Sequence, residues 1–392
     1  MKLTVIGLGQ CGCRIADQFA RLNMKARSER KATIAPAVIA VNTDQADLTG
    51  LRYIPNDHRH RVLLGLRRAL GHGVGKINEI GAELAKEDGD KVLDAVKCMP
   101  SFYETHAFLL VAGAAGGTGS GSLPVVAKMV KERYIGKPVY ALLVLPFEHE
   151  QRTESRSVYN TATCLKSTYD IVDAVFLADN QRYVRKDASL ISNMDIINRM
   201  IVEPFYDLMC AGEVTKARYV GSRTIDGGDI IASLEGWTAI GMGRTELPSF
   251  RFPWEIRKKT FREKALESFR GAQALDATLS DLSLTCDPRD AAKAVYIISG
   301  PEKELNMDMV KNVSNYIKEL APTALIRGGD FPGERHFIDV TLVLSHLSFV
   351  PRIKEIYEQA THYAREHKTQ LEETRKRIEA LAEVGRELPR LG

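Results

Sequence analysis

The chain has 392 residues, a formal net charge of +4 at pH 7, 44% apolar residues and 27% charged residues. Since a domain usually takes roughly 100–200 residues, two or three domains with buried cores are expected. The small net charge gives no reason to expect nucleic acid or an anionic membrane as a partner, and no apolar run approaches the roughly 20 residues needed for membrane insertion.

The N-terminus and the cysteines indicate where the protein works. Charged residues and glycines interrupt the N-terminus, so it does not read as a signal peptide. Six cysteines are scattered along the chain, and only Cys11 and Cys13 are close in sequence. Cysteines that near form neither a zinc pair nor an easy disulfide. We therefore expect reduced thiols and a cytoplasmic protein.

The first element is an apolar strand over residues 3–6, followed by GLGQCG at 7–12 and a helix-like run. Its glycine spacing matches the G-x-G-x-x-G turn that binds dinucleotides. An NAD fold also needs an acid about 20 residues past the glycines to bind the ribose. Here the second strand ends in Asn42-Thr43-Asp44, about 30 residues on. Those side chains suit a phosphate or a metal-bound water better, so the NAD interpretation is weakened.

Apolar runs continue at residues 37–41, 107–112, 138–145 and 174–178, with helix-like segments between them. Near-continuous apolar strands that alternate with helices predict an α/β fold with a doubly wound parallel sheet. In such sheets ligands bind at the carboxyl ends of the strands. We therefore expect the functional site in the polar turns that follow these runs.

The strongest motif for phosphate is GAAGGTGSGS at 113–122, between a buried strand and a helix expected from about Pro124. Glycines let successive backbone N–H groups turn toward an anion, and the helix N-terminus adds partial positive charge. The motif lacks the lysine of a P-loop. A third glycine cluster, Gly71 to Gly75, is weak evidence alone but fits the same site.

Residues 191–211 predict one long, largely buried helix, which Pro204 would kink if it lay in the interior. Strands at 293–299 and 337–344 with helices at 261–270 and near 307–320 predict a second, smaller α/β domain. A charged helix with a narrow apolar stripe then covers 351–388. The chain accordingly divides into a nucleotide-binding domain (1–190), a central helix (191–212), a second domain (213–350) and a C-terminal helix with its tail (351–392).

The ordered set of motifs resembles that of the tubulin/FtsZ family. GQCG at 9–12 is similar to the first nucleotide loop of tubulins, and AGGTGSG at 115–121 is similar to the G-G-G-T-G-[ST]-G signature, with Ala in first position. Further correspondences are Asn42 to Asp44 with the second loop, Gly71 to Gly75 with the third, Pro146-Phe147 and Glu150 with the sugar-binding loop, and TIDGGD at 224–229 with the N-x-D-x-x-D loop of FtsZ, with Thr for Asn. VNTDQADLTGL and GHGVGKINEIGAE are most similar to CetZ, the archaeal tubulin-like family linked to cell shape.

The resemblance implies a nucleotide, GTP or GDP, and a set of residues that bind it. Mg²⁺ would be held mainly by phosphates and water, with no direct protein ligand, as this ion usually is. Glycine-loop N–H groups would bind the phosphates, with the hydroxyls of Thr118 and Ser120. The residues assigned to the nucleotide are Gly9, Gln10, Cys11, Gly12, Cys13, Arg14, Asn42, Thr43, Asp44, Gly71, Gly73, Gly75, Gly116, Gly117, Thr118, Gly119, Ser120, Gly121, Glu150, Asn180, Met194 and Asn198.

Some of these assignments have an ordinary structural alternative. Glu150 would accept hydrogen bonds from the ribose, but it also fits a solvated acid in the charged run EHEQRTESR. Met194 would cover the base, and Asn198 and Asn180 would contact its polar edge. Asn180 is equally plausible as the turn residue that ends its strand. Guanine specificity rests on the resemblance alone.

Asp226 and Asp229 lie just before and at the start of an expected helix. The sequence alone favours helix capping. The resemblance implies that both residues act on the nucleotide of the neighbouring subunit and orient or activate water. A site divided between subunits needs a head-to-tail contact, and such contacts build filaments when they do not close.

We therefore expect a GTP-hydrolysing cytoskeletal protein that assembles head to tail and controls cell shape. The C-terminal helix is expected to pack on the second domain; contact with a lateral partner or a membrane adaptor is the alternative. A nucleotide-binding scaffold with little hydrolysis and an NAD-dependent enzyme are the alternative functions. The NAD enzyme leaves most of the glycine loops and the Asp226 loop without a role.

Overall fold

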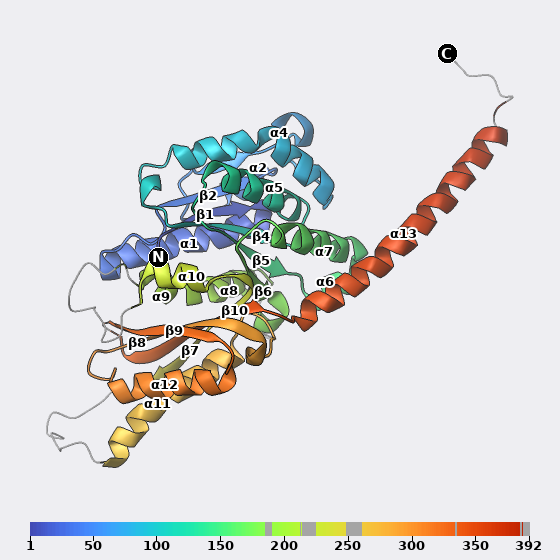
Figure 1. Cartoon of the computed structure of the whole chain (residues 1–392). Coiled ribbons are helices and arrows are strands. Elements are labelled where there is room, and N and C mark those ends of the chain that lie inside the picture. Colours follow the sequence, from blue (N-terminus) through green and yellow to red (C-terminus); the bar gives the residue numbers. More distant parts are fainter. Residues whose placement is uncertain are drawn as a thin grey trace.

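The computed structural model describes residues 1–184, 190–211, 213, 225–247, 261–333, 335–384 and 386. Within these residues the strands form a ten-stranded sheet in the order β3-β2-β1-β4-β5-β6-β7-β10-β8-β9. Figure 1 shows helices on both sides of this sheet and one helix, α13, extending away from the body. The predicted α/β class with a doubly wound parallel sheet is confirmed.

The amino-terminal half of the sheet is parallel throughout, and its strands, apart from the partly buried edge strand β3, are buried on both faces. Leu3 pairs with Ala107 and Leu8 with Ala112, so β1 and β4 run side by side over their full length. Burial on both faces explains why these strands read as continuous apolar runs. The strands are β1 (Leu3–Leu8), β2 (Ala37–Asn42), β3 (Arg61–Leu63), β4 (Ala107–Gly113), β5 (Val139–Leu145) and β6 (Ala174–Asp179).

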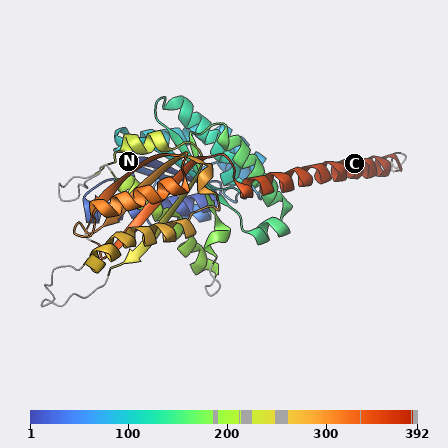
Figure 2. The ribbon, with the colours of Figure 1, turned by 60° about the horizontal axis from the view of Figure 1, so that its bottom comes forward.

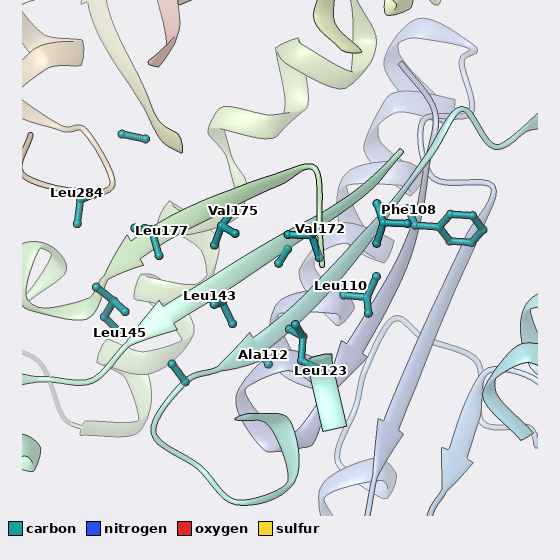
Figure 3. Packing of buried hydrophobic residues seen from close by; sticks show 14 of the residues in the cluster. Phe108, Leu110, Ala112, Leu123, Leu143, Leu145, Val172, Val175, Leu177 and Leu284 are labelled. Carbon is teal, nitrogen blue, oxygen red and sulfur yellow. The ribbon is translucent and has the colours of Figure 1, made fainter. Parts of the chain in front are cut away.

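Alternate side chains of β4 face two different helical layers. Phe108, Leu110 and Ala112 pack with Leu123 of α5 in one cluster, part of which Figure 3 shows. Leu109 and Val111 belong to the opposite cluster, beneath α1. The helices of this half are α1 (Gly9–Arg30), α2 (Gln45–Thr49), α3 (Leu66–Ala69), α4 (Asn78–Lys97), η1 (Phe102–Glu104), α5 (Thr118–Arg133), α6 (Glu148–Thr153), α7 (Ser155–Tyr169) and η2 (Asn180–Tyr183).

The predicted single helix over 191–212 is divided into α8 (Leu190–Val202) and α9 (Pro204–Cys210). Pro204 has no N–H to donate, so the hydrogen-bond ladder lacks the bond at Pro204, while Glu203 still donates to the carbonyl of Arg199 at 2.9 Å. Glu203 nevertheless keeps helical dihedral angles (φ −56°, ψ −38°), so α9 continues the direction of α8. The expected last residue of this helix, Gly212, lies outside the described residues.

The second half shares a sheet with the first instead of forming a separate one. Residues 174–176 of β6 pair in parallel with residues 236–238 of β7, and the rest of β7 pairs with β10. The expected helix at 261–270 extends to Ser280, while β7 and β9 had not been predicted as strands. The elements are α10 (Gly227–Ser233), β7 (Gly236–Glu246), α11 (Phe261–Ser280), η4 (Pro288–Asp290), β8 (Ala291–Gly300), α12 (Met307–Leu320), β9 (Leu325–Pro332) and β10 (Phe337–Leu347).

Helix α13 (Pro351–Val384) packs on the body only at its base. Ile353 and Ile356 are buried there, and Tyr363 meets Tyr159 of α7 edge to face at 6.1 Å. Further along, Ile378 and Leu381 are 60% and 73% exposed. Figures 1 and 2 show this outer part projecting from the molecule. The expected packing along the second domain is therefore wrong, because the base lies against α7 of the first half and the outer part extends beyond the body. None of the described helices combines the length and apolar character that crossing a membrane requires.

Candidate functional site

A cleft of about 530 Å³ opens at the carboxyl ends of β1, β2, β4, β5 and β6. The loops that follow these strands form its walls, as the parallel sheet predicts. Fourteen of the residues assigned from the sequence line it: Gly9, Gln10, Cys11, Arg14, Asn42, Asp44, Gly73, Gly116, Gly117, Thr118, Gly119, Glu150, Asn180 and Met194.

The glycine loop after β4 leads directly into α5. This helix begins at Thr118, earlier than the expected start near Pro124. The first N–H groups of a helix have no partner within it, and Gly117, Thr118 and Gly119 at the start of α5 line the cleft, which also meets the positive end of the helix dipole. A Cβ added at Gly116 would have no neighbour closer than 4.0 Å, so the space beside the loop is open. This arrangement can bind an anion such as a phosphate.

The first loop lies against the second glycine loop. Gly9 has a left-handed φ of +70°, and a Cβ there would come within 2.7 Å of the backbone nitrogen of Gly119. Only glycine permits this approach. Gln10 donates to Asp47 at 2.7 Å. Burial raises the pKa of the Cys11 thiol to about 12, so this side chain stays neutral.

The loop after β2 joins the glycine loops through short polar contacts. The hydroxyls of Thr43 and Thr118 are 2.6 Å apart, and Gly73 donates its N–H to the carbonyl of Thr43 at 3.2 Å. Asp44 caps α2 by accepting from the backbone of Ala46 at 2.8 Å. The carboxylate of Asp44 is therefore held in place by the helix that it caps.

Eight assigned residues lie outside the lining of the cleft. A Cβ at Gly12 would collide with the carbonyl of Val111, and one at Gly121 with the carbonyl of Asn78, so Gly12 lets α1 approach β4 and Gly121 lets α5 approach α4. The Cys13 thiol points at the carbonyl of Val41, 3.4 Å away. The set is Gly12, Cys13, Thr43, Gly71, Gly75, Ser120, Gly121 and Asn198; the hydroxyl of Ser120 donates to the carbonyl of Gly116.

The far end of the cleft has the side chains expected near the base and the sugar. Asn180 is only 7% exposed, and its Oδ1 has no hydrogen-bond partner among the described residues. The rings of Phe147 and His149 stack at 5.4 Å. Glu150 accepts from the N–H of Phe147 at 3.2 Å and so caps α6. Since a carboxylate has several acceptor positions, capping leaves Glu150 able to accept from a ligand.

The sequence interpretation missed several residues of this site. Lys76, Asp47 and Ser157 line the cleft, and Asn160 lies behind its wall. Lys76 directly follows the third glycine cluster, which was a usable signal. Asn160 lies in the middle of α7, and nothing in its local sequence distinguished it.

The Asp226 loop lies at the amino ends of β1 and β4, opposite to the cleft at their carboxyl ends. Asp226 is exposed and accepts at 2.7 Å from the N–H of Asp229, which confirms the expected cap of α10. The guanidinium of Arg327 lies 3.3 Å from the Asp229 carboxylate. Thr224, the residue in place of the family's Asn, lies outside the described residues. In the part of the chain that the structure describes, no group of three or more His, Cys, Asp and Glu side chains could hold a metal ion.

The cleft and the fold define a nucleotide-binding protein of the tubulin class, and residues 2–186 match the Tubulin/FtsZ family, GTPase domain. Residues 187–362 match the C-terminal domain of tubulin-like CetZ. The chain is 35% identical over 376 residues to the tubulin-like protein CetZ1 of Haloferax volcanii, with 92% of each chain covered. It therefore belongs to the tubulin-like CetZ family.

Solved structures support the same relationship. The GDP-bound monomer of CetZ1 from Haloferax volcanii superposes with a TM-score of 0.79 at 33% identity, covering 93% of this chain and 100% of the other. The GTPγS-bound protofilament of CetZ2 from the same organism also gives 0.79, at 27% identity, with 94% and 100% covered. FtsZ of M. jannaschii, at 23% identity and a TM-score of 0.65, shares the fold. Membership of this family replaces the NAD interpretation of the first loop.

Proposed function

We propose that this protein binds and hydrolyses GTP and assembles head to tail into protofilaments. Each active site would comprise the cleft of one subunit and the Asp226 loop of the next. Family membership, the geometry of the cleft, and the GDP and GTPγS bound by the two Haloferax relatives support this function.

One observation carries the proposal of a shared site: the cleft lies at the carboxyl ends of the parallel strands, and the Asp226 loop lies at their amino ends. A Cβ at Gly227 would lie 3.4 Å from His106 and 3.6 Å from Met1. These residues precede β4 and β1, whereas the glycine loops follow the same strands. A six-residue strand spans about 20 Å, since each residue rises roughly 3.3 Å. Asp226 therefore cannot reach the cleft of its own subunit, but it can reach that of a second copy stacked head to tail.

The residues of the cleft fit a hydrated nucleotide–Mg²⁺ complex. The first turn of α5 would bind the phosphates through backbone N–H groups, and Thr118 would add a hydroxyl. Asn42, Asp44 and Asp47 place oxygen atoms at the edge where waters of Mg²⁺ would lie, and the ion would rest mainly on phosphates and water. Asp226 and Asp229 of the neighbouring subunit would orient or activate the attacking water.

The base and the sugar would occupy the far end of the cleft. Asn180 would offer its buried amide to the base, Met194 would cover the base, and Glu150 would accept from the ribose. Asn198 is buried on α8, outside the lining, so we assign it to support of this end of the cleft. Control of cell shape is the cellular role that CetZ membership favours, and the exposed part of α13 is where a lateral partner or a membrane adaptor would bind.

The experiment that tests the shared site is complementation between two inactive variants. Asp226→Asn removes the acid but keeps the cleft, and Gly116→Asp places a negative charge in the open space where phosphate would bind. Neither variant alone should hydrolyse GTP. A 1:1 mixture should recover up to about a quarter of the wild-type rate, since that share of head-to-tail contacts joins an intact cleft to an intact acid.

Two results would contradict the proposal. The first is a mixture as inactive as its components under conditions in which wild-type protein hydrolyses GTP. The second is a wild-type rate per subunit that stays constant as the protein concentration rises, because a site shared between subunits requires assembly.

A further inference from the structure

We propose that Lys76 distinguishes a nucleoside triphosphate from a diphosphate by exchanging its ion pair with Glu154 for one with the terminal phosphate. This inference rests on the proposed function, because it takes the cleft to be the nucleotide site. It assigns a specific role to a residue that the sequence interpretation had not included in the site.

Lys76 lies in the same wall of the cleft as the glycine loop after β4. It has a left-handed φ of 60°, which is uncommon for a residue with a side chain. A Cβ at Gly117 would come within 2.9 Å of the Lys76 carbonyl carbon, so the two loops touch through their backbones. The Lys76 side chain lines the cleft together with Gly117 and Thr118. We therefore place the γ-phosphate of a bound triphosphate beside this wall, within reach of the flexible Lys76 side chain.

A buried amide fixes this arrangement from behind. Asn160 of α7 is fully buried, and its Nδ2 donates to the carbonyl of Lys76 at 2.8 Å and to those of Ala115 and Gly116 at 3.1 Å each. One side chain thus ties the backbone of Lys76 to the glycine loop. Because the backbone is anchored, only the flexible lysine side chain has to move when its partner changes.

The present partner of the Lys76 ammonium is Glu154, across the rim of the cleft. The two side chains are 56% and 44% exposed, and such solvent-exposed ion pairs contribute little net free energy. Glu154 also accepts from the Ser157 hydroxyl at 2.9 Å, so its carboxylate keeps a partner when the lysine leaves. The neighbouring guanidinium of Arg156 is paired with Glu79. The lysine can therefore be released at little cost.

A terminal phosphate is the stronger partner for this lysine. Hydrogen bonds from an ammonium to a phosphate are charge-assisted at both ends, and the phosphate carries more negative charge than a single carboxylate. The diphosphate lacks the γ-phosphate, so Lys76 would stay with Glu154 when a diphosphate is bound. The exchange would thus add affinity only for the triphosphate.

The test compares the affinity of the full chain for GTPγS and GDP, with Mg²⁺, by fluorescence titration. Lys76→Met should weaken GTPγS binding about tenfold or more while changing GDP binding less than about twofold, because one charge-assisted contact is lost. Lys76→Arg should restore part of the preference. Glu154→Gln removes the competing carboxylate and should strengthen GTPγS binding relative to GDP. Lys86→Met, an exposed lysine on α4, is the matched control and should change neither affinity.

The outcomes separate the two proposals. If Lys76→Met leaves the ratio of the GTPγS and GDP affinities unchanged, whether or not both affinities fall, the role of Lys76 is overturned. A wild-type chain that binds neither GTPγS nor GDP would overturn the proposed function itself. Since Glu154→Gln leaves the lysine in place, its effect on the affinity ratio also tests the exchange if Lys76→Met folds poorly.

Discussion

The carboxylate of Asp226 accepts the backbone N–H of Asp229 at 2.7 Å, so the acid proposed to act on the neighbouring nucleotide is also the N-cap of α10. The two roles depend on different chemistry. Capping needs an oxygen acceptor, which Asn supplies about as well as Asp. Activation of water needs the negative charge, which Asn lacks.

Replacing Asp226 by Asn should therefore preserve the fold and abolish turnover. We expect Asp226→Asn to keep the thermal midpoint and GTP affinity of the wild type and to lose hydrolysis by roughly 10²–10⁴-fold, the usual contribution of general acid–base catalysis. Asp226→Ala should lose the same activity and also about 1 kcal/mol of stability, because the cap is removed. Thermal unfolding and phosphate release measure the two effects. If Asp226→Asn hydrolyses GTP at the wild-type rate, Asp226 has the capping role alone.

Two glycines of one motif should respond differently to alanine. Gly121→Ala should lower the thermal midpoint, because the new Cβ would strike the carbonyl of Asn78 and separate α4 from α5. Gly116→Ala has open space around it and should leave the midpoint within about 1 °C of the wild type, since surface changes of this kind are nearly neutral. Differential scanning fluorimetry of both variants checks the contrast. Equal midpoints would mean that the two helices can move apart without cost.

The position of the cleft could be predicted because its determinants are local. Apolar runs predict strands, and a glycine cluster directly after a strand predicts a loop at its carboxyl end. What each glycine does was not predictable to the same degree. Gly12 and Gly121 belong to phosphate motifs, yet each makes room for the backbone of another segment. A missing side chain looks the same in the sequence whether it admits a ligand or a helix.

Long-range contacts account for the rest of what the sequence could not indicate. The amide of Asn160 binds the carbonyl of Lys76, 84 positions away, and that of Gly116, 44 positions away. Periodicity and motif spacing act over a few turns of chain and carry no information on such pairs. The division of the central helix at Pro204 was a local effect that the sequence did indicate, although the helix continues in the same direction instead of kinking.

Asn180 should determine which base is bound. Its Oδ1 is buried and has no partner among the described residues, so a polar edge of a bound base can supply one. We expect Asn180→Ala to weaken GDP binding about tenfold, roughly the free energy of one buried hydrogen bond, with little loss of stability. Isothermal titration with GDP and ADP measures both affinity and preference. If Asn198→Ala weakens GDP binding and Asn180→Ala does not, the base is recognised from α8.

A buried ion pair joins the central helices to the second half of the sheet, and its removal should be costly. Arg335 donates to both carboxylate oxygens of Asp207, at 2.8 and 2.6 Å, and the two side chains are 12% and 2% exposed. Arg335→Met should lower the free energy of unfolding by about 3–5 kcal/mol at pH 7, because it removes the two-pronged partner of a buried carboxylate. Adding Asp207→Asn should restore part of that loss. Urea unfolding followed by circular dichroism measures both variants.

The same pair predicts a pH dependence with a definite sign. Burial alone would raise the pKa of Asp207, but Arg335, with smaller contributions from Arg30 and Ser299, outweighs it and holds the pKa below its usual value. The folded state therefore binds this proton more weakly than the unfolded state, so the pair stabilises the protein above about pH 4 and less as the pH falls through the folded pKa. In Arg335→Met the carboxylate keeps its burial and only the weaker influence of Arg30 and Ser299, so its pKa rises. The variant should therefore become less unstable relative to the wild type as the pH falls from 7 toward 4. A stability difference that stays constant over this range would mean that Arg335 stabilises the fold through packing instead of charge.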